Sequence, residues 1–165
     1  MNLDELEASA KDYLRLLNEY PNHRNRAGER FLDLSFYAML QGRFGKMSRQ
    51  LNLRVSSSNH PLRIDFRHGG NNPILIELAV RPHGGGQQFD ASSNRAELRK
   101  LARFRQSQAR VCVLLLLDLY PTHLTKNQLR HHYAQITSAQ GKYKRHAVTV
   151  IYVHPDHGFR FEWSR

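Results

Sequence analysis

The chain is poor in cysteine and in long apolar runs, and both absences limit what it can be. Its 165 residues include one cysteine, Cys112, which excludes an internal disulfide framework and fits a reducing compartment. No apolar stretch approaches the roughly 20 residues that span a bilayer. The acidic start, MNLDELEAS, lacks the basic and then apolar order of a secretory signal. We therefore expect one domain over residues 1–165, cytoplasmic and without a membrane partner.

Acidic residues are also scarce. The sequence has 14 Asp and Glu against 25 Lys and Arg, which gives a formal net charge of +11. A surface this basic favours a polyanionic partner, chiefly nucleic acid, and a binding affinity that depends on salt concentration. We expect DNA rather than RNA as that partner. A basic protein that binds no polyanion is the alternative that composition leaves open.

The hydrophobic pattern predicts an α/β fold. Helical spacing of apolar residues predicts helices over 3–20, 27–44, 94–106 and from Thr122 or Thr125 to about 139. Alternating or continuous apolar residues predict strands over 62–67, 74–81, 111–117, 147–153 and 159–163. The continuous run at 111–117 is typical of a strand covered on both faces, so it marks the centre of a parallel or mixed sheet. We interpret the segment from Arg43 to Arg54 as a basic link between helix and sheet.

Two of these strands each carry a carboxylate between apolar residues. Asp65 lies in LRIDFRH and Glu77 lies in ILIELAVR, and the segment GGNNP joins the two strands. If the strands pair antiparallel about this turn, Asp65 lies opposite or next to Glu77. Two acids within reach of one cation are the simplest explanation of the pattern.

Further charged residues are candidates for the same site or for contact with phosphate groups. Glu29 falls on the apolar stripe of its helix, where a carboxylate needs a partner or a metal, although a solvated acid in the first turn is equally plausible. The helix over 94–106 carries many cations and few acids, which favours a phosphate-facing surface. The candidates for binding nucleic acid are Arg81, Arg95, Arg99, Arg103, Lys126 and Arg130.

In this order of elements the chain resembles the PD-(D/E)xK nuclease superfamily, which has the restriction-endonuclease-like fold. The matching parts span about residues 25–153: the helical Glu29, the strand with Asp65, the strand with Glu77, and the crossover to the strand at 111–117. The resemblance implies a three-layer α/β/α domain with a mixed central sheet. Its core would be residues 25–165, with residues 1–24 as a helical extension that completes an N-terminal helical pair. It also implies that Asp65 and Glu77, assisted by Glu29, hold Mg²⁺ or Mn²⁺ for phosphodiester hydrolysis.

One position departs from the family pattern. The lysine expected two residues after the glutamate is Ala79 here. Some members of the superfamily carry this lysine on the following helix, which makes Lys100 the candidate catalytic residue and Arg81 a weaker one. Glu97 could lie near the same cleft, although a role in capping the helix is the simpler interpretation.

Two further explanations of Ala79 remain open. The domain could be a catalytically inactive module that binds nucleic acid or a protein partner within a larger complex, or the sequence could carry an inactivating substitution. A homodimer fits an enzyme that cuts both strands of a duplex. An unrelated protein-binding domain that uses the first helix is the remaining alternative.

Overall fold

The computed structural model describes residues 1–22, 28–54, 60–71, 73–84, 89, 94–107, 111–137 and 148–161. The predicted ends of the last helix, at about 139, and of the last strand, at 163, lie outside these residues. So does the side chain of Glu29, although its backbone is described.

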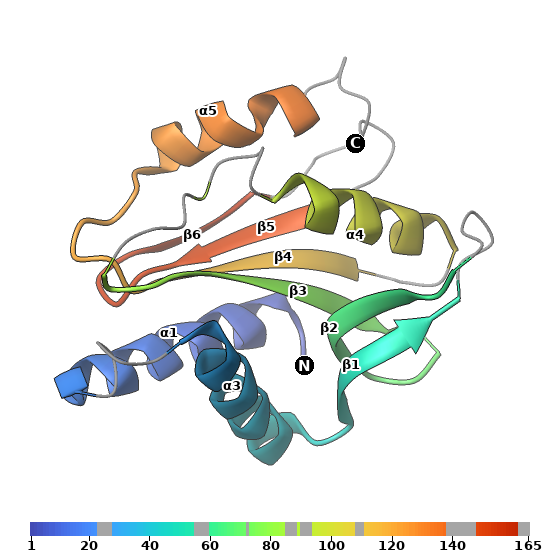
Figure 1. Cartoon of the computed structure of the whole chain (residues 1–165), viewed down its shortest axis with the longest axis horizontal. Helices are drawn as coiled ribbons and strands as arrows, with labels where there is room; N and C mark the ends of the chain where they lie inside the picture. Colours follow the sequence, from blue (N-terminus) through green and yellow to red (C-terminus); the bar gives the residue numbers. More distant parts are fainter. Residues whose placement is uncertain are drawn as a thin grey trace.

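The centre of the fold is a six-stranded mixed sheet in which the strands follow one another in chain order. The first three strands form an antiparallel meander, β4 and β5 continue the sheet in parallel with β3, and β6 returns antiparallel to β5 (Figure 1). The strands are β1 (Met47–Leu53), β2 (Leu62–His68), β3 (Ile74–Arg81), β4 (Val111–Asp118), β5 (Val148–Val153) and β6 (Gly158–Phe161).

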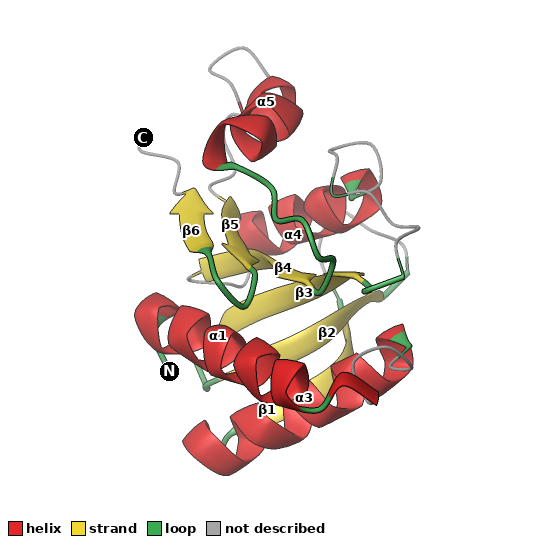
Figure 2. Ribbon diagram, turned by 90° about the vertical axis from the view of Figure 1, so that its left-hand side faces the viewer, coloured by secondary structure: helices red, strands yellow, loops and turns green. Residues whose placement is uncertain are grey.

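Helices cover both faces of this sheet. α1 (Leu3–Glu19) and α3 (Glu29–Phe44) lie on one face, and α4 (Arg95–Ser107) and α5 (Lys126–Thr137) lie on the other (Figures 1 and 2). Each face has its own apolar core, and β3 and β4 contribute alternate side chains to the two. The predicted α/β fold with a mixed sheet between helices is therefore confirmed.

The N-terminal helix is built into the domain. Leu6, Ala10 and Leu14 are buried in the same core as α3 and the strands. Asn2 and Glu5 form a capping box at the start of α1, which satisfies backbone donors that have no partner within the helix. Residues 1–24 therefore include a core element, and α1 is more than an extension added to a core that begins at residue 25.

The largest error of the sequence-based prediction concerns β1, which was expected to be a basic link. Met47, Arg49, Leu51 and Leu53 alternate as an edge strand would, but Arg49 in the apolar row conceals the pattern. In the structure Arg49 forms an ion pair with Asp33 of α3, so its charge is compensated where it lies. The strand pairs with β2 from Met47 opposite His68 to Leu53 opposite Leu62.

No described helix has both the length and the apolar character that crossing a membrane requires.

Candidate functional site

The site begins where the pairing of β2 with β3 ends. The described pairs run from His68 opposite Ile74 to Phe66 opposite Ile76, and Asp65 and Glu77 are the next residues on the two strands. Beyond this point a side chain takes the place of the backbone hydrogen bonds between the strands, because Asp65 Oδ2 accepts a hydrogen bond from the backbone N–H of Leu78 at 2.9 Å. The two acids therefore lie side by side, as the predicted hairpin requires.

A local distortion of β1 and β2 accompanies this arrangement. Gln50 has a left-handed backbone with φ of 53°, and it lies between Arg49, which pairs with Phe66, and Leu51, which pairs with Ile64. Phe66 belongs to the core under α1 and α3, whereas Ile64 belongs to the core under α4. Apolar side chains of β2 therefore point to one face of the sheet before Asp65 and to the other face after it. Asp65 lies across from Gln50, the residue with the left-handed backbone. Left-handed backbone in a residue other than glycine costs on the order of 1 kcal/mol or more, and such strain often accompanies a functional site.

Glu77 is deeply buried, with 1% of its surface exposed. It points towards α4, where Lys100 Nζ lies 2.7 Å from Glu77 Oε2. Burial raises the pKa of Glu77 to about 9, and the negative charge of Asp65 contributes to the increase, while the positive charge of Lys100 opposes it. Glu77 therefore retains a proton at neutral pH unless additional positive charge is bound nearby.

Lys100 approaches the acid from the helix rather than from the strand. Ala79 is buried on the same face of β3 as Glu77, so the strand carries a methyl group two residues after this acid. α4 covers this face through Leu98, Leu101 and Phe104. Since Lys100 is partly exposed on the same helix, its amine combines contact with a buried acid and access to solvent.

An acid that the sequence analysis missed lies on the other side of Asp65. Asp33 of α3 and Asp65 line one hollow of about 240 Å³, together with Arg30, Gln50 and Leu78. Asp33 Oδ2 accepts hydrogen bonds from the guanidinium of Arg49 and, at 3.4 Å, from Gln50 Nε2. The structure thus brings an acid from α3 to Asp65.

The predicted helical acid was Glu29, one turn before Asp33. Glu29 is the first residue of α3, after an N-cap at Gly28. The spacing of four residues between Glu29 and Asp33 was the signal that could have identified Asp33, because both positions face the same side of a helix.

Two carboxylate oxygens of this region lack a hydrogen-bond partner. Within the described residues, Asp33 Oδ1 and Glu77 Oε1 are the only buried side-chain nitrogen or oxygen atoms in that condition. A buried carboxylate oxygen without a partner is unfavourable, and a hard cation such as Mg²⁺ prefers oxygen ligands of this type. The described residues contain no group of three or more His, Cys, Asp or Glu side chains arranged to hold a metal. Mg²⁺ commonly uses one or two carboxylates and keeps several waters, so Asp65 and Glu77 fit it by donor chemistry.

Arg81 was a candidate both for binding nucleic acid and for replacing the lysine, and the structure gives it a different environment. Its guanidinium donates to both carboxylate oxygens of Asp118, at 2.7 and 2.5 Å, and to the carbonyl of Thr122 at 2.6 Å. Asp118 is fully buried and also accepts a hydrogen bond from Tyr152 at 2.5 Å. These contacts favour a structural role for Arg81, joining the ends of β3, β4 and β5.

The other predicted contacts for nucleic acid lie on the layer of α4 and α5. Arg95, Arg99 and Arg103 are exposed on α4, and Lys126 and Arg130 are exposed on α5. The N-terminus of α5 is capped by Thr125 and Gln128, as one of the two sequence alternatives proposed. These cations therefore share the layer from which Lys100 reaches Glu77 (Figure 2).

The structure thus brings Asp65, Glu77 and Lys100 together, adds Asp33 nearby, and places Arg81 elsewhere. Searches of protein-family models, of curated proteins and of solved structures each found no match to this chain.

Proposed function

We propose that the protein is a divalent-metal-dependent nuclease with a variant active site. The observation that carries the proposal is the contact of Lys100 with Glu77, directly beside Asp65. Two acids and one amine converge from two strands and a helix, in a chain that otherwise carries a large excess of positive charge. The order of elements around them agrees with the resemblance to the PD-(D/E)xK superfamily.

Asp65 and Glu77 are the residues proposed to hold Mg²⁺ or Mn²⁺. The bound ion supplies a water of lowered pKa and stabilises negative charge on the phosphoryl oxygens. Burial raises the pKa of Glu77, and the positive charge of a bound cation would lower it again, so Glu77 would hold the ion as a carboxylate. Lys100 acts in place of the strand lysine, orienting the attacking water or neutralising charge on the phosphate. Glu29 remains a proposed third acid, and Asp33 is the alternative one turn further along α3.

The proposed substrate is nucleic acid, DNA ahead of RNA, in the cytoplasm. The exposed cations of α4 and α5 would contact phosphates on either side of the site, and such contacts make binding fall steeply with salt concentration. The residues proposed to bind nucleic acid are therefore Arg95, Arg99, Arg103, Lys126 and Arg130.

The second candidate is a catalytically inactive module of the same fold that binds nucleic acid or a protein partner. Ala79 favours it, and so does the hydrogen bond that occupies Asp65 Oδ2, because both leave fewer groups available for chemistry than an active site of this family is expected to have. In this case the cations of α4 and α5 would retain nucleic acid without help from the acids.

The decisive experiment is a cleavage assay with single- and double-stranded DNA and with RNA, in Mg²⁺, Mn²⁺ or EDTA. The variants are Asp65→Ala, Glu77→Ala and Lys100→Ala. Asp156→Ala, in the turn between β5 and β6, and Lys11→Ala, on α1, are matched controls that remove one charge of each sign outside the site. We expect cleavage in Mg²⁺ or Mn²⁺ that the three site variants lose and the two controls retain. Cleavage that persists in EDTA or in the Glu77 variant would refute the proposal, and salt-sensitive DNA binding without cleavage would favour the inactive module.

A further inference from the structure

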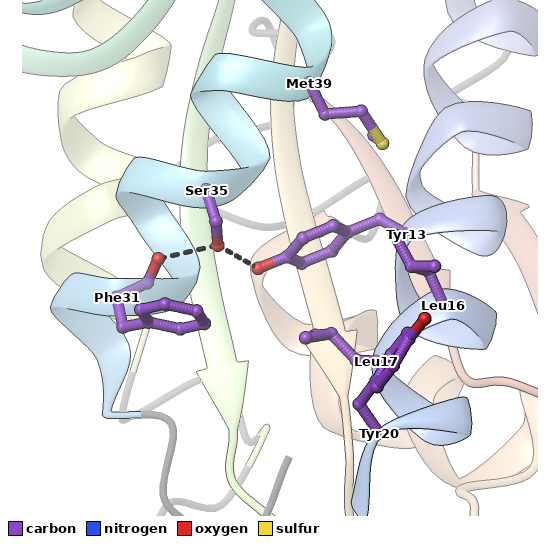
Figure 3. A pocket seen from close by; sticks show the side chains of 7 residues that line it. All are labelled: Tyr13, Leu16, Leu17, Tyr20, Phe31, Ser35 and Met39. Atoms are coloured by element: carbon purple, nitrogen blue, oxygen red, sulfur yellow. Dashed lines mark hydrogen bonds between the residues drawn. The ribbon is translucent and has the colours of Figure 1, made fainter. Parts of the chain in front are cut away.

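An apolar groove runs between α1 and α3, on the face of the sheet opposite α4 and α5. It has a volume of about 330 Å³ and is lined by Tyr13, Leu16, Leu17, Tyr20, Phe31, Ser35 and Met39 (Figure 3). Its polar atoms are already used inside the protein, because the Tyr13 hydroxyl lies 2.5 Å from Ser35 Oγ, which donates in turn to the carbonyl of Phe31. The groove therefore offers apolar contact and little else.

Large apolar residues are exposed at this groove and next to it. Leu16 and Tyr20 of α1 and Phe31 of α3 line the groove and are 51%, 56% and 48% exposed, and Leu34 of α3, which follows Phe31 by three residues, is 53% exposed. The opposite side of α3 is also apolar, since Leu32, Phe36 and Leu40 are fully buried against the sheet. A helix that is apolar on both sides is normally covered on both sides, and a cluster of exposed apolar residues marks an interaction surface.

The shape and charge of this face favour a protein as the occupant. A groove whose walls are half exposed would leave much of a small molecule in contact with water, whereas ligand sites usually bury most of their guest. α1 and α3 together carry seven acidic and four basic residues, so the excess positive charge of the chain lies elsewhere. Nucleic acid and anionic lipid are attracted to basic surfaces, and this face is not basic.

α1 carries one basic and one acidic residue that could pair with the same two residues of a second copy. Arg15 and Glu19 are exposed one turn apart on the outer surface of α1, and within the described residues neither has an ion pair. A twofold axis between two antiparallel α1 helices would bring Arg15 of each copy to Glu19 of the other. Twofold contacts require this kind of self-complementary surface. It is also the face through which two copies with a charge of +11 can approach without bringing their excess positive charge together.

We propose that this groove is the interface of a homodimer, in which Phe31 and Leu34 of each copy pack against α1 and α3 of the other. The proposal does not depend on the nuclease assignment. The partner is a second copy of this chain, held by apolar contact at the groove and oriented by reciprocal pairs between Arg15 and Glu19.

Sedimentation velocity on the purified protein distinguishes a monomer from a dimer by the mass of the species in solution. We expect a dimer of about twice the 19.2 kDa chain mass that persists at high salt, because apolar burial supplies most of the affinity. Leu34→Glu and Phe31→Ser are each expected to weaken dimerisation by on the order of 100-fold, since each removes a buried apolar side chain twice per dimer. Asn127→Asp, which adds one negative charge at an exposed position on α5, is the control and is expected to leave the dimer intact. Circular dichroism and thermal unfolding establish that the variants are folded.

A charge exchange tests the twofold arrangement. Arg15→Glu alone places two acids opposite each other at both pairs, and Glu19→Arg alone places two bases there, so each variant is expected to dimerise about 10-fold more weakly at low salt. An equimolar mixture of the two variants restores opposite charges at both pairs and is expected to dimerise as wild type does. A monomeric wild-type chain, or a Leu34→Glu variant with wild-type affinity, would overturn the interface, and a mixture no stronger than the single variants would overturn the twofold pairing.

Discussion

Replacing Glu77 with glutamine tests the central electrostatic claim, that this acid is held protonated in the folded chain. The pKa of Glu77 is raised from 4.5 to about 9 in the folded state. Between these values the unfolded chain releases the proton and the folded chain keeps it, so raising the pH stabilises the unfolded state. The contribution of Glu77 to stability is therefore fully present below about pH 4.5 and is lost as the pH rises towards 9. Glutamine has nearly the same shape as a protonated glutamate, and it does not titrate.

The size of the effect follows from the width of this window. A shift of one pKa unit corresponds to about 1.4 kcal/mol, so between pH values of about 5.5 and 8 wild type should lose about 3 kcal/mol relative to Glu77→Gln. Urea unfolding followed by circular dichroism, in EDTA and at several pH values, measures this difference. Asp156→Asn, at an exposed position in the turn between β5 and β6, is the control and should follow wild type. If wild type and Glu77→Gln lost stability in parallel across this range, Glu77 would be ionised in the folded chain and the reasoning would be wrong.

Three further predictions use the same structure. Mn²⁺ affinity is expected to rise with pH up to about 9, because binding at Glu77 displaces its proton, and calorimetry in two buffers of different ionisation enthalpy should detect the released proton. Asp118→Ala is expected to lower the free energy of unfolding by about 3 to 5 kcal/mol, because it leaves the nearly buried Arg81 without its ion-pair partner. Urea unfolding measures the loss, with Asp156→Ala, which removes an exposed acid, as the control. Phe36→Ala is expected to lower the free energy of unfolding by about 3 to 5 kcal/mol, since Phe36 is fully buried against Tyr13 and Phe66. Phe36→Leu is expected to lower it less in the same urea unfolding experiment.

Local patterns were sufficient to predict the parts of the fold and site that depend on neighbouring residues. The alternation around Asp65 and Glu77, with the turn between them, predicted a hairpin that brings the two acids together. The charge pattern of the following helix included Lys100, and the structure brings this residue to Glu77.

The features that were missed depend on contacts between distant parts of the chain. β1 escaped notice because Arg49 is neutralised by Asp33, an interaction invisible in the local sequence. Arg81 resembled a phosphate ligand because Asp118, its partner, follows a long way along the chain. Asp33 was not singled out because a stripe of apolar residues does not reveal which acids of a helix meet the sheet.

The chain order of the strands has a consequence for how the protein folds. Each strand pairs only with its neighbours in chain order, so the sheet can grow from one end without waiting for distant segments to meet. Sheets built from such sequential pairings close shorter loops and tend to fold faster than sheets whose strand order is shuffled. Asp65, Glu77 and Lys100 all precede β4, and strand β5 and the covering helix α5 come later. A nascent chain can therefore align the backbone of both acid-bearing strands while its C-terminal third is still being synthesised.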